Sequence, residues 1–219
     1  MSVTDRRIGP NQMAFDLGYD PAMAAEPRLV EAMLREVDQL FDLVMIMELM
    51  DESLVLLRRL MCWSTDDVVS LPKQERVHSR RTALSDEQRA ALEEYLTLDV
   101  ALYRHFRRRM ADRVAAVPLE TFLSQAETLV QRRRFWHQKC VLNTVNGFDL
   151  EGDQREFTDK VHGYQLRDAN DWMCSRLGMA EVGYTDFLRG TQRQRLAVRD
   201  HVSELLRIAD VTQTPANQR

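Results

Sequence analysis

The sequence has few glycines and none of the short motifs that build a phosphate-binding loop. Only 8 of its 219 residues are glycine, and neither GxxxxGK followed by Ser or Thr nor GxGxxG occurs. The HExxH pattern of zinc proteases and the GxSxG pattern of α/β-hydrolases are absent as well. No catalytic constellation is therefore complete in the residues of this chain.

Cysteine is scarce, with three residues far apart in the chain, Cys62, Cys140 and Cys174. They form no CxxC pair and no Cys/His spacing typical of zinc ligands, so a metal site is not predicted. Two alternatives stay open: three buried thiols, or one disulfide and one spare cysteine.

Long apolar runs are also missing, because no stretch approaches the ~20 residues needed to cross a bilayer. The first residues lack the basic and then apolar layout of a signal peptide. Taken by itself, the chain is expected to be soluble and cytosolic. A net charge of −4 argues against a nucleic-acid partner, although basic residues cluster at 73–81, 107–109 and 132–134.

An apolar run, a polar turn and a helical pattern follow one another between residues 41 and 63. Residues 41–47 show no polar alternation, which predicts a parallel strand covered on both faces. A helix is predicted to begin at Asp51 or Glu52, whose carboxylates suit the exposed amides of a first turn. Such a turn lies where α/β enzymes bind ligands. Residues 68–71 are a candidate second strand.

The remainder is mostly helical by its periodicity. Residues 1–26 are irregular, 27–84 form the strand–helix unit with a basic loop, 85–209 are predominantly helical and 210–219 are frayed. Pro27 opens the first helix, and Ser85 with Gln88 is typical of a capping box. A loop is predicted at 143–152 and helical pieces at 165–177 and 181–209.

Three segments carry a family resemblance: ESLVLLRRLMCW with the DDVV that follows, GPNQMAFDLGYD, and LDVALYRHF. They are similar to the galactose 3-O-sulfotransferases, and the likeness covers residues 8–175, the C-terminal half of that family. The resemblance implies an α/β fold. This chain would hold part of a P-loop-type sulfotransferase fold, with one or two parallel strands and a predominantly helical C-terminal portion.

The resemblance also implies an activity. Such an enzyme transfers a sulfuryl group from 3′-phosphoadenosine 5′-phosphosulfate (PAPS) to the 3-hydroxyl of galactose on a glycolipid or glycoprotein glycan, without a metal. It implies the lumenal side of the Golgi membrane, with membrane attachment only through a segment outside this chain. An oxidising lumen would favour a disulfide among the three cysteines, without identifying the pair.

Candidate site residues follow from position and chemistry. Glu48 ends the predicted strand and could contact the sugar acceptor, and His105 could serve as a general base. The non-functional alternatives are that Glu48 is a solvated strand end and that His105 is a histidine on a helix surface. The loop at 73–81 resembles a basic loop of the family and predicts donor-binding cations, which a solvated loop would equally supply. These cations are Lys73, Arg76, Arg80 and Arg81.

The donor-binding motifs of the family have no counterpart in residues 1–40. The chain is therefore expected to be either a fragment or a degenerate relative, and to be inactive by itself. Two rival functions remain: a non-catalytic helical interaction module built on the same scaffold, and another nucleotide-using α/β enzyme that lacks its first half.

Overall fold

The computed structural model describes residues 9–72 and 83–212, with side chains described as far as residue 203. The chain divides into two compact units, each with its own internal contacts. The first is made of Met1–Ser70 and Thr82–Phe135, and the second of Leu71–Arg81 and Trp136–Arg219.

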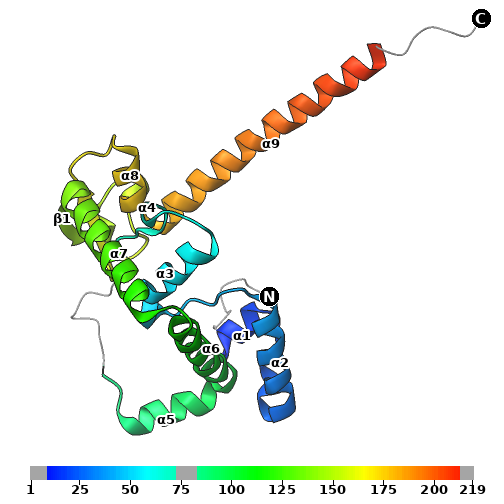
Figure 1. Cartoon of the computed structure of the whole chain (residues 1–219), viewed down its shortest axis with the longest axis vertical. Helices are drawn as coiled ribbons and strands as arrows, with labels where there is room; N and C mark the ends of the chain where they lie inside the picture. Colours follow the sequence, from blue (N-terminus) through cyan, green and yellow to red (C-terminus); the bar gives the residue numbers. More distant parts are fainter. Residues whose placement is uncertain (1–8, 73–82, 213–219) are drawn as a thin grey trace, which may run out of the picture. The chain divides into compact units, whose positions relative to one another are not determined.

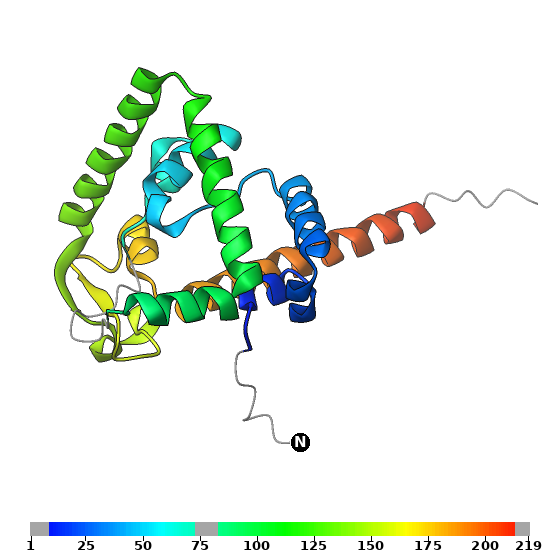
Figure 2. The same cartoon turned by 90° about the horizontal axis from the view of Figure 1, so that it is seen from below.

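Among the residues that the structure describes, the first unit contains helices and 3-10 turns joined by irregular segments, and no strand. Figures 1 and 2 show α6 packed beside α1 and α2, with α5 leading into it. Its helices and 3-10 turns are α1 (Gln12–Asp16), η2 (Pro21–Ala25), α2 (Pro27–Leu40), η3 (Met47–Leu49), α3 (Met50–Leu60), α4 (Thr65–Val68), α5 (Asp86–Tyr95), α6 (Thr97–Ala115) and the part of α7 (Leu119–Cys140) before Trp136.

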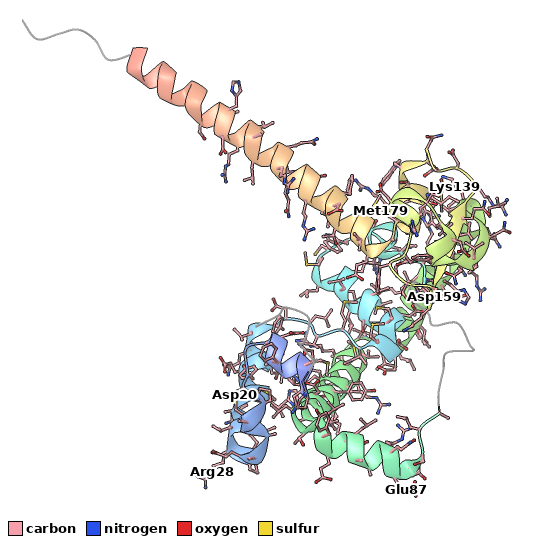
Figure 3. The ribbon with its side chains drawn as sticks, turned by 180° about the vertical axis from the view of Figure 1, so that it is seen from behind. Asp20, Arg28, Glu87, Lys139, Asp159 and Met179 are labelled. Atoms are coloured by element: carbon pink, nitrogen blue, oxygen red, sulfur yellow. A yellow bond between two sulfur atoms is a disulfide. The ribbon has the colours of Figure 1, made fainter. Side chains whose placement is uncertain are left out.

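Several helix starts confirm the sequence predictions. Pro27 occupies the first turn of α2, and the Ser85–Gln88 capping box opens α5 close to Glu87, which Figure 3 labels. Helix α3 begins at Met50, one or two residues earlier than the predicted start at Asp51 or Glu52, and both acidic residues lie in its first turn. Carboxylates there interact favourably with the helix dipole.

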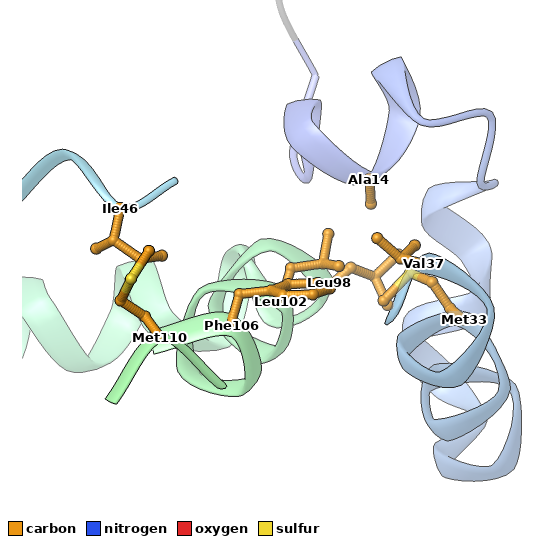
Figure 4. Close-up of a cluster of buried hydrophobic side chains, with 8 residues drawn as sticks. All are labelled: Ala14, Met33, Val37, Ile46, Leu98, Leu102, Phe106 and Met110. Atoms are coloured by element: carbon orange, nitrogen blue, oxygen red, sulfur yellow. The ribbon is translucent and has the colours of Figure 1, made fainter. Parts of the chain in front are cut away.

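The core of the first unit is an apolar cluster that α6 organises (Figure 4). Four side chains at intervals of four residues form one buried stripe along this helix, as an amphipathic helix requires. Side chains from α1, α2 and the segment before η3 cover this stripe. The cluster consists of Ala14, Met33, Val37, Ile46, Leu98, Leu102, Phe106 and Met110.

Helices α1 and α6 also cap each other. The side-chain oxygen of Asn11 accepts hydrogen bonds from the backbone N–H groups of Leu98 at 2.8 Å and Asp99 at 3.2 Å. The Asp99 carboxylate in turn accepts from the N–H groups of Met13 and Ala14 at 3.2 and 3.0 Å. The first amides of a helix lack intrahelical partners, so each side chain satisfies the start of the other helix.

The predicted parallel strand at residues 41–47 is wrong. The backbone is extended at Phe41 and Ile46, but the segment pairs with no strand in the described ranges and passes into η3 at Met47. A strand needs a neighbour for its backbone hydrogen bonds, and this segment runs between helices.

Residues 68–71 form no strand either, because Val68 belongs to helix α4 and the residues after it are irregular. The parallel strands expected of a P-loop-type fold are thus not found in the described part of the chain.

The second unit contains an antiparallel hairpin instead. Strands β1 (Val141–Asn146) and β2 (His162–Leu166) pair in antiparallel register, where a loop and the beginning of a helix were predicted. Turns η5 (Gly147–Asp149) and η6 (Gly152–Gln154) lie between the two strands.

Helices α8 (Trp172–Gly178) and α9 (Glu181–Thr212) follow the hairpin. A disulfide between Cys140 and Cys174 ties the end of α7 to α8, and Cys62 is free and exposed. The structure therefore selects the alternative of one disulfide and one spare cysteine. The Lys139 ammonium (labelled in Figure 3) adds an ion pair at 2.8 Å to Asp171, which caps α8.

Candidate functional site

The structure describes two of the predicted site residues, Glu48 and His105, both in the first unit. The predicted donor-binding cations Lys73, Arg76, Arg80 and Arg81 lie outside the described residues, so their role stays a prediction.

Glu48 lies in the turn η3 and is exposed to solvent. It lines the rim of a pocket of about 390 Å³ and is the charged side chain among the described residues around it. The other lining residues are Met13, Leu17, Val37, Phe41, Leu43, Val44, Met45, Ile46, Met47, Leu102, Tyr103 and Phe106. A carboxylate beside apolar surface can accept hydrogen bonds from sugar hydroxyls while carbon atoms cover the sugar ring.

A second hollow, of about 480 Å³, adjoins this pocket through Tyr103, which lines both. Leu49, the residue after Glu48, also lines the second hollow, together with Arg104, Arg107 and Arg108 of α6. Residues three and four apart share one side of a helix, so α6 presents these three guanidinium groups together.

The charge of this second hollow is largely uncompensated. Arg104 bonds to Glu93 at 2.6 Å, whereas Arg107 and Arg108 have no carboxylate partner among the described residues. Guanidinium groups bind phosphate and sulfate through paired N–H donors. The hollow is therefore suited to an anion.

His105 lies on another side of α6 and lines neither hollow. Its Nε2 is 3.9 Å from Oδ1 of Asp38, beyond hydrogen-bond distance, and is buried without a hydrogen-bond partner in the part of the chain that the structure describes. Arg109 donates from Nε to the same Asp38 oxygen at 2.9 Å. The structure thus does not bring His105 and Glu48 together at one pocket.

The basic stretch at 132–134 connects helices in the first unit. Arg132 makes two hydrogen bonds to Asp66, at 2.7 and 2.6 Å, and these raise the pKa of its guanidinium. Arg133 makes a paired contact with Asp51. Arg132 and Arg133 therefore join α7 to α4 and α3.

The sequence interpretation missed Tyr103 and Arg104 as site residues. The signal was the spacing of four between Tyr103 and Arg107, and between Arg104 and Arg108, which gives one polar side of α6. It could not show that Glu48 and Leu49, more than fifty residues earlier, border the same surface.

Neither a metal-binding cluster nor a membrane-spanning helix is found in the described residues. No three His, Cys, Asp or Glu side chains there gather in a way that could hold a metal ion. None of the helices described is both long and apolar enough to cross a bilayer.

Comparisons with known proteins place this chain beside a group of sulfotransferases. The family model described as Galactose-3-O-sulfotransferase matches residues 6–192. Human Galactose-3-O-sulfotransferase 2 is 35% identical over 187 residues, which cover 80% of this chain and 47% of that protein.

Two further relatives show the same partial coverage. Human Galactosylceramide sulfotransferase is 38% identical over 186 residues, covering 80% of this chain and 44% of the relative. Mouse Galactose-3-O-sulfotransferase 3 is 32% identical over 211 residues, covering 90% and 49%. The chain thus spans about half the length of the curated relatives that it matches, and no solved structure matches it.

Proposed function

Because the family model covers residues 6–192, this chain belongs to the galactose-3-O-sulfotransferase family, and we propose that it supplies the acceptor-facing part of a galactose 3-O-sulfotransferase. The complete enzyme would transfer a sulfuryl group from PAPS to the 3-hydroxyl of galactose on a glycolipid or glycoprotein glycan. The complete enzyme would act on the lumenal side of the Golgi membrane.

The observation that carries this proposal is that a carboxylate, a phenol and several guanidinium groups line two adjoining hollows. Glu48 lines the pocket, the arginines line the second hollow, and Tyr103 lines both. A carboxylate and a phenol can hold sugar hydroxyls, and the arginines can neutralise a sulfate or phosphate.

The proposed reaction needs few groups. The 3-hydroxyl oxygen attacks the sulfur of PAPS, the bond from sulfur to the bridging phosphate oxygen breaks, and 3′-phosphoadenosine 5′-phosphate leaves. The hydroxyl proton passes to a base, for which Glu48 is our candidate, while Arg104 and Arg107 stabilise charge on the moving group. His105 is a weaker candidate, because it faces Asp38 and lines neither hollow.

Lys73, Arg76, Arg80 and Arg81 remain our proposed contacts to the donor nucleotide. Because no donor loop is recognisable in the sequence, we expect the isolated chain to be inactive. The purified chain, given labelled PAPS and methyl β-galactoside, should form no sulfated sugar. Turnover would contradict this expectation.

Acceptor binding provides a direct test without turnover. We expect methyl β-galactoside to bind the purified chain weakly but saturably, measured by NMR shift changes. Glu48→Gln should weaken binding about tenfold, because it removes a charged hydrogen-bond acceptor. Glu52→Gln, in the neighbouring helix and outside the pocket lining, is the matched control.

Absence of saturable galactoside binding would overturn the acceptor-facing role. Equal binding by the Glu48 and Glu52 variants would remove Glu48 from the site and leave the rest of the proposal to be judged by Arg107→Ala. That variant should lower the affinity for inorganic sulfate, measured by calorimetry.

A further inference from the structure

Helix α9 carries an exposed, mainly apolar stripe along the part whose side chains the structure describes. The members of this α9 stripe recur every three or four residues, so they lie on one side of the helix. They are Tyr184, Phe187, Leu188, Thr191, Arg195, Val198 and Val202. Val198 is 64% exposed and Val202 is 47% exposed. Since an amphipathic helix gains most of its stability by packing its apolar side, this stripe is suited to contact with another surface.

The second unit holds α9 near its start. A Cβ on Gly183 would lie 2.6 Å from the carbonyl oxygen of Asp153, so the first turn of α9 rests directly on η6. Figure 1 shows the rest of α9 extending away from the hairpin and from α8. The outer part of the stripe is therefore accessible to a partner.

Arginines gather on the same helix. Residues 187–199 contain four arginines and no Asp or Glu. Two of them, Arg193 and Arg195, have no carboxylate partner among the described residues. Arg195 belongs to the stripe, and Arg193 lies on the opposite side of the helix. A basic amphipathic helix of this kind is typical of segments that lie on a membrane surface.

Aromatic rings extend this surface from α9 to α8. The Arg176 guanidinium lies 5.2 Å from the centre of the Trp172 ring and 5.0 Å from that of Phe187. Trp172 is itself 65% exposed. Tryptophan and tyrosine are enriched where apolar surface meets water, as in the headgroup region of a membrane. Helix α8 and the start of α9 thus present aromatic and cationic groups together.

We propose that the α9 stripe and the Trp172 ring bind the surface of a membrane that contains anionic phospholipids. The apolar side chains enter the region below the headgroups, and the arginines pair with the headgroup phosphates. This contact is additional to any attachment through a segment outside this chain.

The position of Arg195 favours a lipid surface over a second copy of the helix. A guanidinium buried between two helices needs a carboxylate opposite it, and the stripe contains no Asp or Glu. At a lipid surface the long Arg195 side chain reaches the phosphates while its neighbours stay in the apolar layer. A soluble polyanion would pair with the arginines but leave Val198 and Val202 exposed to water.

Vesicle sedimentation of the purified full chain tests this proposal. We expect binding to phosphatidylcholine vesicles that contain about one third phosphatidylserine, and binding at least about tenfold weaker to phosphatidylcholine alone. Added salt should weaken the binding, because it screens the arginines. Brominated phosphatidylcholine in the anionic vesicles should quench tryptophan emission more strongly in the parent chain than in Trp172→Phe.

Two neighbouring substitutions separate the stripe from charge alone. Val198→Asp places a carboxylate in the stripe and should weaken vesicle binding more than about tenfold. Ala197→Asp adds the same charge about 100° away around the helix, outside the stripe, and should weaken binding about fivefold or less. Circular dichroism checks that both variants fold, and if Val198→Asp does not, the quenching in the unaltered chain decides.

A second pair of variants tests the cation. Arg195→Gln should weaken binding to the anionic vesicles about fivefold, the effect of one arginine near a charged surface. Arg35→Gln removes an equally exposed kind of cation from α2 in the first unit and should leave the binding unchanged.

The proposal is overturned if anionic vesicles do not bind the chain, if neutral vesicles bind it equally well, or if the two aspartate variants bind equally. Self-association without lipid that Val198→Asp abolishes would assign the stripe to a second copy instead. Capture by heparin in place of vesicle binding would assign the arginines to a soluble polyanion. No donor or galactoside is used, so failure here is separate from failure of the proposed function.

Discussion

At the scale of single residues, the first unit depends on Asn11, which is 3% exposed and has a positive φ of 60°. Replacing it by glycine keeps that backbone conformation but removes the acceptor for the Leu98 and Asp99 amides. We expect Asn11→Gly to lower the free energy of unfolding by about 1–2 kcal/mol, measured in urea.

A matched variant separates the lost bonds from backbone strain. Asn11→Ala loses the same acceptor and adds the cost of a left-handed conformation at a residue with a Cβ, about 1 kcal/mol more. Equal stability of the glycine and alanine variants would contradict the role of the backbone conformation.

Asp51 provides a second test at this scale. Its carboxylate is paired with Arg133, whose Nε is buried without a partner in the described ranges. Asp51→Asn should destabilise the first unit by about 1–2 kcal/mol, because it leaves a half-buried cation without its charge partner. Glu52→Gln, one residue away and without an ion pair to a described residue, should stay within about 0.5 kcal/mol of the parent chain.

At the scale of elements, the stability of helix α8 should depend on pH through its N-cap residue, Asp171. Hydrogen bonds from the Lys139 ammonium, and then from the Cys174 and Met173 amides, lower the pKa of Asp171. The ionised carboxylate therefore stabilises the fold above the unfolded pKa of about 3.9, and this stability is lost as pH falls through the lower folded-state pKa.

Urea unfolding of Asp171→Asn measures this contribution. The gap in midpoint between the parent chain and the variant should be widest near pH ~6 and should close as pH falls below the unfolded pKa of about 3.9 and through the lower folded-state pKa. Asp159→Asn, whose carboxylate has no hydrogen bond to a described residue, is the control and should show a small gap at every pH. A gap for Asp171→Asn that stays constant with pH would contradict the prediction.

The elements that the sequence predicted well carry their own local signals. Pro27 and the Ser85–Gln88 pair fix where α2 and α5 begin, because these residues act within one turn of their own helix. Residues 41–47 misled the prediction, since an apolar run reports burial and not the presence of a paired neighbour. The hairpin of β1 and β2 was missed because its strands are separated by two irregular turns.

At the scale of the whole molecule, the disulfide should stabilise one unit and not the other. Cys140 and Cys174, 34 residues apart, both belong to the second unit. Replacing both by alanine should cost that unit about 3–4 kcal/mol in the loop-closure view, seen as faster hydrogen exchange in β1 and β2.

The same replacement should leave exchange in the core of α6 unchanged, because that helix belongs to the first unit. Cys62→Ser is the control and should alter neither region. Faster hydrogen exchange in both units would show that they unfold together, contrary to the prediction.

Family membership could be inferred from the sequence, because short matching segments identify a relative without any knowledge of how they fold. The candidate site could be inferred only in part. Glu48 was found from its position after an apolar run, whereas its neighbours Tyr103 and Arg104 come from a helix whose approach depends on the buried apolar cluster that contains Val37 and Leu102. Long-range packing of this kind leaves no local pattern in the chain.

The free thiol at the end of helix α3 has a practical use. Because Cys140 and Cys174 are oxidised together, Cys62 alone would take a maleimide dye or a spin label under non-reducing conditions. A reporter attached there follows the first unit, so unfolding of that unit could be watched in solution without altering the disulfide-bonded unit.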